Sequence, residues 1–302
     1  MLQLGAHLPQ NEFGDDVPAL RDYIVGAEAI GYDYMIMGEH ILSHDASTQA
    51  PQTREEPRPY TPDWVWHEPM VLFGYLAAVT ERIKFMPSVL VLPLRQATLL
   101  AKQAAEVDVL SGGRLILGIG VGWSGLEFEA MNEDFRTRGR RAEEQIELMR
   151  RLWTEPLVEF EGRFHRIAGG GLNPRPAASI PIWAGGMSEP VLDRIGRVCD
   201  GWSIQRTFYT ELSPEDADAH FAERLETVHA AARSVGRDPS EIDLGAAIDV
   251  VGNTLEQQVT LARQWEARGA THLALRTTRA GLTELDEHLE ALRAFHEAYH
   301  AG

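Results

Sequence analysis

The chain has 302 residues, of which 44% are hydrophobic and 24% charged, and this composition excludes a disordered or fibrous protein. Its formal net charge of −17 gives a surface that repels nucleic acid and anionic membranes, so we expect neither as a partner. The single cysteine, Cys199, excludes an internal disulfide bond.

Short apolar runs alternate with longer segments of helical periodicity along the whole chain. The runs predict strands at residues 2–8, 32–37, 83–92, 115–121, 180–184, 201–204, 242–251 and 272–276. The segments between them predict helices at 17–30, 69–80, 96–110, 140–153, 190–198, 216–234, 255–268 and 284–299. Several strands are apolar throughout, as in parallel strands that helices cover. Eight such units predict an α/β fold, a (β/α)8 TIM barrel in which residues 1–302 form one domain with insertions.

Two stretches interrupt this alternation. Residues 43–67 follow the second strand and are rich in proline, threonine and charge. A long loop at the carboxyl end of a barrel strand is typically a substrate lid. We assign Trp64 and Trp66 of this loop to the substrate pocket, together with His7 at the end of the first strand. Residues 155–179, between the fourth helix and the fifth strand, predict a small hairpin followed by a strap rich in glycine and proline.

The second strand ends in Glu39 and His40, whose side chains point to opposite sides unless the strand has already turned. A histidine at the carboxyl tip of a barrel strand can exchange a proton with a reacting ring. The alternative is a histidine held by a loop carbonyl. His40 and His44 have a spacing seen in zinc sites, but the residues between them have a loop composition, so we predict no metal.

The third strand contains Pro87, which cannot donate a ladder hydrogen bond, so we expect a bulge or kink near Ser88. In the fourth strand, glycines at every second position precede Trp123. The side of the strand that carries these glycines has no side chains, so a flat ring could lie against its backbone. The alternative is that the glycines only relieve crowding inside the barrel. The run is not a dinucleotide fingerprint, because a bulky tryptophan follows it.

The fifth strand ends in Gly185-Gly186-Met187-Ser188, and a helix is predicted to begin there. Backbone N–H groups in the turn, with Ser188 as the N-cap, favour phosphate binding without a lysine. The alternative is an ordinary tight turn. The amino-terminal sequence has no signal-peptide pattern, and no run of about 18 apolar residues occurs, so we expect a cytoplasmic protein. Cys199 lies in an apolar helical segment, and we expect its side chain to be buried.

Several of these motifs occur in the order found in one family. They are Gly38-Glu39-His40 and the runs TERIKFMPSVLVLPLR, LSGGRLILGIGVGW, RGRRAEEQIELMRRLW and PIWAGG. The chain thereby resembles the luciferase-like monooxygenase superfamily, and specifically its coenzyme F420-dependent oxidoreductases. The similarity extends from about residue 2 to the last helices and is strongest between residues 69 and 187.

The resemblance implies a barrel whose cofactor lies across the carboxyl ends of the strands. It implies a non-prolyl cis peptide bond at Ser88-Val89 that supports the cofactor ring. It places Gly120, Gly122 and Trp123 beside the cofactor, and it places Gly185, Gly186 and Met187 at its phosphate. It makes His40 the best candidate for catalysis, with Glu39 next to it. In the sugar-phosphate dehydrogenases of the family an acidic proton donor stands where this chain has Trp123, so that reaction is not carried over.

These features predict hydride transfer between the deazaflavin C5 of coenzyme F420 and a small organic substrate. The first alternative is an FMN-dependent two-component monooxygenase of the same family, which would need a separate flavin reductase as its partner. A redox-inert barrel hydrolase that uses carboxylates such as Glu39 and Asp249 is an alternative of another class. The family analogy also suggests a homodimer.

Overall fold

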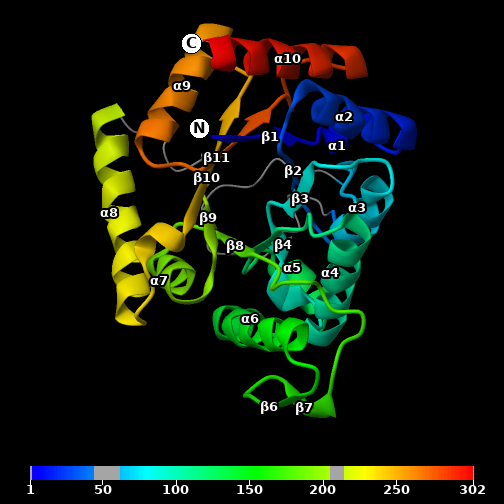
Figure 1. Ribbon diagram of the computed structural model, residues 1–302, viewed down its shortest axis with the longest axis vertical. Helices are drawn as coiled ribbons and strands as arrows, with labels where there is room; N and C mark the ends of the chain where they lie inside the picture. Colours follow the sequence, from blue (N-terminus) through cyan, green and yellow to red (C-terminus); the bar gives the residue numbers. More distant parts are fainter. Residues whose placement is uncertain (1, 44–61, 205–213, 302) are drawn as a thin grey trace.

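Parallel strands form the centre of the molecule and helices surround them (Figure 1). The computed structural model describes residues 2–43, 62–204 and 214–301. In these residues one sheet has the strand order β3-β2-β1-β11-β10-β9-β8-β5-β4. Its strands are β1 (Gln3–His7), β2 (Tyr34–Met37), β3 (Lys84–Pro87), β4 (Leu90–Val91), β5 (Leu117–Gly120), β8 (Ile182–Gly185), β9 (Gly201–Ser203), β10 (Asp243–Asp249) and β11 (His272–Arg276).

The two ends of this sheet meet, so the sheet closes into a barrel. Phe85 of β3 pairs with the segment before β5: its N–H donates to Arg114 O at 2.9 Å, and its carbonyl accepts from Ile116 N at 2.9 Å. β3 and β4 are two halves of the predicted third strand, which breaks after Pro87 at the cis peptide bond Ser88-Val89. With these halves counted as one, all eight predicted strands are present and the predicted TIM barrel is confirmed.

The eight predicted helices are also present. They are α2 (Val17–Ile30), α3 (Pro69–Ala77), α4 (Ala97–Ser111), α6 (Arg138–Thr154), α7 (Glu189–Val198), α8 (Pro214–Ser234), α9 (Leu255–Ala267) and α10 (Leu285–Ala301). Two short helices were not predicted, α1 (Gln10–Phe13) and α5 (Gly125–Ala130). The helix ends follow capping chemistry: Asp16 and Thr254 cap the starts of α2 and α9, and Gly31 ends α2 in a left-handed conformation. No helix of the described residues is long and apolar enough to cross a membrane.

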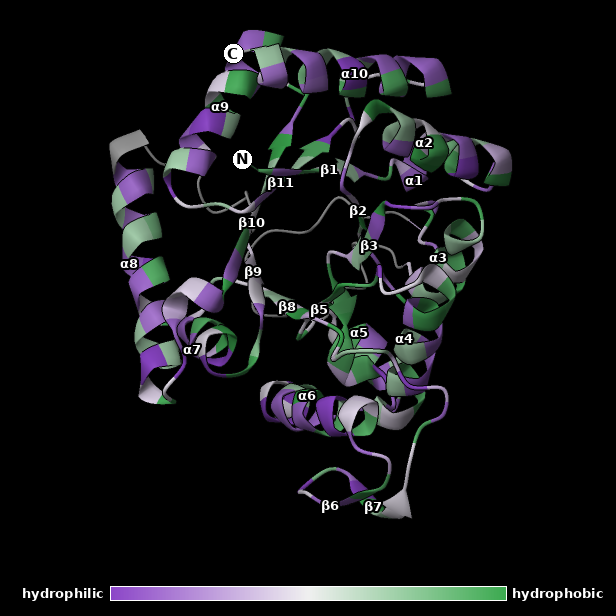
Figure 2. Cartoon of the chain, viewed as in Figure 1, coloured by the Kyte–Doolittle hydropathy of each residue, from purple (hydrophilic) through white to green (hydrophobic). Residues whose placement is uncertain are grey.

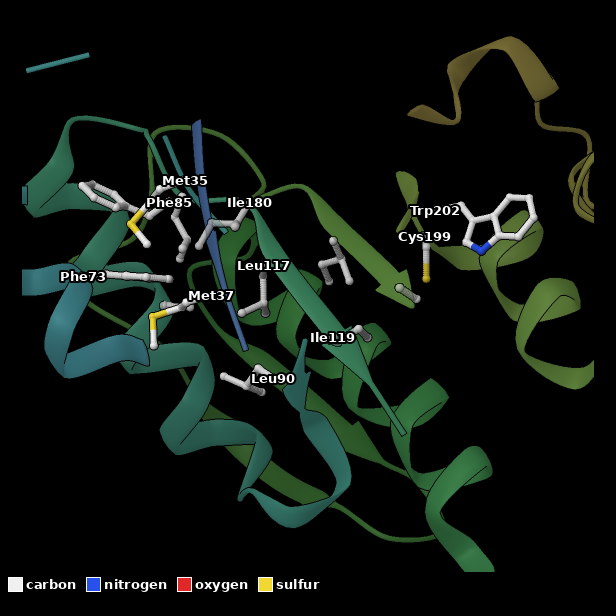
Figure 3. Close-up of a cluster of buried hydrophobic side chains, with 14 of the residues drawn as sticks. Met35, Met37, Phe73, Phe85, Leu90, Leu117, Ile119, Ile180, Cys199 and Trp202 are labelled. Carbon is white, nitrogen blue, oxygen red and sulfur yellow. The ribbon is translucent and has the colours of Figure 1, made fainter. Parts of the chain in front are cut away.

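Side-chain alternation divides the apolar residues into two cores. On β2, Met35 and Met37 face outward and belong to the large cluster between strands and helices, shown in Figure 3. Tyr34 and Ile36 face inward and join a second cluster inside the barrel with Trp183. Strands β5, β8 and β11 are therefore mostly apolar, whereas helices α8, α9 and α10 carry both polar and apolar residues (Figure 2).

Glycine makes room for the large rings inside the barrel. A Cβ atom at Gly5 would lie 2.3 Å from the Tyr34 ring, and one at Gly245 would lie 2.5 Å from the Trp183 ring. Any larger residue at these positions would displace the aromatic side chains. The barrel interior is thus filled at this level by Tyr34 and Trp183.

The predicted insertion between the fourth helix and the fifth strand is an antiparallel hairpin of β6 (Val158–Glu161) and β7 (Arg166–Gly170). It projects beyond α6 (Figure 1). Glu144 of α6 fastens it by accepting hydrogen bonds from Nδ1 of His165 at 2.8 Å and from the backbone N–H groups of Arg163, Phe164 and His165. Cys199, at the end of α7, is fully buried, as the sequence predicts.

Candidate active site

A cavity of about 790 Å³ opens at the carboxyl ends of the strands. Its wall contains His7 at the end of β1, Ser203 at the end of β9, Asp249 at the end of β10 and Arg276 at the end of β11. Its floor is formed by the inward-facing residues of the barrel, Tyr34, Ile36, Met86, Trp183 and Ala274. This is the face on which barrel enzymes carry their active sites, and the volume is that of a small-molecule pocket.

His7 lines this cavity, as the sequence predicts. Its Nδ1 is buried and has no hydrogen-bond partner among the described residues. Burial, with a smaller effect from the nearby Arg276 cation, lowers the pKa of His7 to about 3. The imidazole is therefore neutral at physiological pH, which gives the cavity an uncharged hydrogen-bonding group.

Asp249 and Arg276 form a two-point ion pair in the cavity wall. Arg276 Nε lies 2.6 Å from Asp249 Oδ1, and Nη2 lies 3.2 Å from Oδ2. Trp64 and Trp66 line the same cavity, with ring centroids 5.7 Å apart, and the guanidinium of Arg279 lies 4.6 Å from the Trp64 ring. Residues 44–61 of the predicted lid lie outside the described residues.

His40 adjoins the cavity through an aromatic contact. Its ring packs edge-on against Trp66 at 4.9 Å and against Trp123 at 5.5 Å, measured between ring centroids. Its Nδ1 lies 3.1 Å from Oε2 of Glu127, a residue of α5 that was not among the predicted site residues. The structure therefore brings together His40, Trp66 and Trp123, which were predicted separately, and adds a buried carboxylate to them.

Glu39 points away from this group. Its carboxylate forms a two-point ion pair with Arg95, whose Nη1 lies 2.6 Å from Oε1 and whose Nη2 contacts Oε2. The N–H of Val91 donates to the same carboxylate at 2.9 Å. Burial raises the pKa of Glu39, and the Arg95 cation and the Val91 N–H act against this. The ion pair gives Glu39 a structural role, and its predicted catalytic role stays a prediction.

The third and fourth strands meet at the cis peptide bond. Ser88 lines the cavity, and its hydroxyl lies 3.3 Å from that of Ser203, while Val89 packs against the glycine face of β5. A Cβ atom at Gly120 would lie 2.6 Å from Val89 Cγ2, and one at Gly122 would lie 2.6 Å from Val91 Cγ1. These glycines make room for the broken strand, which is the crowding alternative; their role at a cofactor stays a prediction.

The predicted phosphate turn joins β8 to α7. Gly186 has a φ of 139°, and Ser188 occupies the N-cap position of α7, although its hydroxyl makes no capping hydrogen bond. Arg224 of α8, which was not among the predicted site residues, reaches this turn, with Nη1 3.4 Å from the Met187 carbonyl oxygen. Met187 itself is buried. The turn therefore has a cation beside it within this acidic chain.

The family model of the luciferase-like monooxygenases matches residues 2–302. The chain belongs to this family. A relative named F420-dependent glucose-6-phosphate dehydrogenase, from Segniliparus rotundus, is 30% identical over 237 residues, which are 74% of this chain and 62% of the relative. An FMNH2-dependent dimethylsulfone monooxygenase of Pseudomonas fluorescens is 35% identical over 137 residues, which are 44% of this chain and 37% of that protein.

The crystal structure of the monooxygenase RslO1 from Streptomyces bottropensis has the same fold. It superposes on this chain with a TM-score of 0.76 and 18% sequence identity, and the match covers 100% of both chains. This chain spans only part of the curated relatives that it matches. It covers 61% of the length of a relative that is 37% identical, and 62% of the length of the F420-dependent relative from Segniliparus rotundus.

Proposed function

We propose that this protein binds coenzyme F420 and transfers a hydride between the deazaflavin C5 and a small organic substrate. The observation that carries the proposal is the cavity at the carboxyl ends of the strands, whose wall includes Trp66, with the His40 ring packed against Trp66 and against Trp123. The F420-dependent relative, which aligns with 74% of the chain, supports the same cofactor.

The residues present fit a tricyclic ring that carries a phosphate. The cavity has the volume of a cofactor site, and its aromatic wall suits a flat ring. We assign Ser88, Val89 and Trp123 to the ring, and the turn at Gly186 and Met187 to the phosphate. The bound deazaflavin would supply the hydride-exchanging carbon. The chain itself orients the substrate against this ring and excludes water from it with Trp64 and Trp66.

His40 is the group that we propose to exchange a proton with the substrate. A hydride leaves or enters a substrate carbon while the attached oxygen loses or gains a proton, so the reaction needs one acid–base group near that oxygen. The His40 ring packs against Trp66 of the cavity wall and against Trp123. His7 is less suited to this role because a pKa of about 3 makes its imidazole a weak base, and it serves the substrate as a hydrogen-bond partner instead.

An FMN-dependent two-component monooxygenase is the second candidate, because a relative of that activity is 35% identical over 137 residues. It would use the same cavity and would receive reduced flavin from a separate reductase. The hydrolase alternative is weaker. The carboxylates of Glu39 and Asp249 are each held at two points by an arginine, and no group of His, Cys, Asp and Glu in the described part of the chain is arranged to hold a metal. We propose in addition a single cytoplasmic domain that forms a homodimer.

Anaerobic titration of the protein with F420 and with FMN, followed by the fluorescence of each cofactor, tests the proposal. We expect tight binding of F420 and weak binding of FMN. The reverse order, with oxygen consumed on addition of reduced FMN, would replace the proposal by the second candidate. With a substrate found by screening, His40→Ala should lower kcat at least 100-fold. His300→Asn, at an exposed position on α10, is the matched control and should turn over normally.

A further inference from the structure

We propose that Glu127 is the positioning residue for His40. Its carboxylate holds the proton of the imidazole on Nδ1, so that Nε2 is the nitrogen through which His40 exchanges a proton with the substrate. This inference rests on the proposed acid–base role of His40 and deepens it.

The two side chains are close and shielded from solvent. Nδ1 of His40 lies 3.1 Å from Oε2 of Glu127, and the side chains are 8% and 2% exposed, respectively. The edge-on contacts of Trp66 and Trp123 restrict the remaining freedom of the imidazole. The ring is thus held both by its neighbours and by a hydrogen bond to one defined nitrogen.

The second oxygen of Glu127 fixes the backbone that follows His40. Oε1 accepts hydrogen bonds from the N–H of Ile41 at 2.7 Å and from the N–H of Leu42 at 3.3 Å. One carboxylate therefore sets both the ring and the main chain of the segment that carries it. A shift of Glu127 would therefore move the His40 ring and the backbone that follows it together.

Charge determines which nitrogen carries the proton. Burial opposes ionisation of Glu127, but the hydrogen bond and the charge of His40, together with the hydrogen bonds from the N–H groups of Leu42 and Ile41, leave the pKa of Glu127 below the usual value. An ionised carboxylate only accepts hydrogen bonds, so Nδ1 must be the donor and a neutral His40 must leave Nε2 unprotonated. When a substrate O–H bond breaks, its proton goes to Nε2, and the imidazolium so formed faces the Glu127 anion. In the opposite direction the N–H bond breaks and the proton returns to the substrate oxygen.

Glu127→Gln separates this role from a structural one. The amide oxygen of Gln still accepts from the N–H of Ile41, so the backbone contact is kept. The amide –NH2 then faces Nδ1 and donates to it, which forces the proton of His40 onto Nε2. Shape is preserved and the tautomer is reversed. A residue that merely anchored the loop would be replaced by Gln with little effect.

The chain contains a matched control pair. His165 and Glu144 make the same contact, Nδ1 to Oε1 at 2.8 Å, where α6 meets the β6–β7 hairpin. Glu144 also accepts hydrogen bonds from backbone N–H groups, as Glu127 does. Glu144→Gln therefore removes an equivalent carboxylate at a site that has no place in the proposed reaction.

Nitrogen-15 NMR of histidine-labelled protein tests the assignment without substrate or cofactor, with the His40 signals identified by their loss in His40→Asn. We expect the neutral His40 ring as the Nδ1–H tautomer in the wild type and as the Nε2–H tautomer in Glu127→Gln. Glu144→Gln should alter only His165. An Nε2–H tautomer in the wild type, or the same tautomer in the wild type and in Glu127→Gln, would overturn the proposal.

Steady-state kinetics provide a second test of the positioning role of Glu127. Glu127→Gln should lower kcat about 100-fold to 10,000-fold with KM within about threefold, and it should remove the acid–base limb of the pH profile, as expected when a histidine base is in the wrong tautomer. Glu127→Asp, which keeps the charge, should recover part of the loss. Failure of F420 to bind would refute the proposed function and leave the tautomer assignment standing. A full-rate Glu127→Gln enzyme with F420 bound would refute the positioning role alone.

Discussion

Replacement of Arg95 by methionine should destabilise the protein strongly, because it leaves a buried carboxylate without its cation. The Glu39 and Arg95 side chains are 2% and 13% exposed, and they meet through two pairs of atoms. Methionine keeps the apolar stem of arginine and removes the guanidinium. After the change, the N–H of Val91 still donates to Glu39 at 2.9 Å.

Breaking a buried ion pair by the removal of one partner costs about 3–5 kcal/mol. Burial already raises the pKa of Glu39 above its ordinary value of 4.5, and loss of Arg95 removes the main effect that opposes this rise. A carboxyl with a raised folded-state pKa is most favourable to stability below its unfolded pKa, and stability falls as the pH rises toward the folded pKa. The loss in free energy of unfolding caused by Arg95→Met should therefore grow by about 1.4 kcal/mol per pH unit between the unfolded-state and the folded-state pKa of Glu39.

Urea unfolding followed by circular dichroism at pH 5 and pH 8 measures these quantities. Arg95→Met should lose about 3–5 kcal/mol at pH 8 and clearly less at pH 5. The double variant Arg95→Met/Glu39→Gln should be less destabilised than the sum of the two single variants, since it leaves no unpaired charge. Strict additivity together with a deficit that is equal at both pH values would refute the reasoning.

Three further predictions concern single side chains. Burial lowers the pKa of His7 to about 3, so below about pH 6.5 the unfolded chain binds a proton at His7 that the folded state does not, and stability falls. Urea titrations should therefore show that His7→Phe loses less stability than the wild type between pH 7 and pH 4. In Gly118→Ala the new Cβ would lie 2.0 Å from the carbonyl oxygen of Pro87, so the melting temperature should fall by about 5 °C, whereas Gly74→Ala, in open space on α3, should not lower it. Burial raises the pKa of Cys199 to about 12, so a thiol reagent should label the native protein slowly and the urea-unfolded protein at once; rapid labelling of the native state would contradict this.

The barrel could be predicted because each of its strands carries a local signal. Apolar runs of strand length recur between helical segments, and Pro87 marks the break in the third strand, because proline lacks the N–H that the ladder needs. Side-chain alternation on β2 also sorts the residues into the two cores, with Tyr34 inside and Met35 outside. Helices α1 and α5 escaped prediction because four and six residues are too few to show a helical period.

The partners of the predicted site residues could not be read from the sequence. Glu127 lies 87 residues from His40, and Arg95 lies 56 residues from Glu39, so only the closed barrel brings them together. One local signal did exist. Ser124-x-x-Glu127 has the spacing of a capping box, in which the glutamate would turn back to the N–H of Ser124. In the structure Ser124 accepts the N–H of Glu127, but the carboxylate turns to His40 and Ile41 instead.

The carboxyl end of β2 is thus held from two sides by carboxylates with different tasks. Glu39 is paired with a permanent cation, Arg95, so its charge is balanced whatever happens in the cavity. Glu127 faces a histidine, whose charge changes in the proton transfer that we propose. The first pair should therefore govern stability and the second should govern proton transfer. If Glu127→Gln instead destabilised the fold as much as Arg95→Met does, both carboxylates would be anchors and the acid–base role of the His40–Glu127 pair would have to be abandoned.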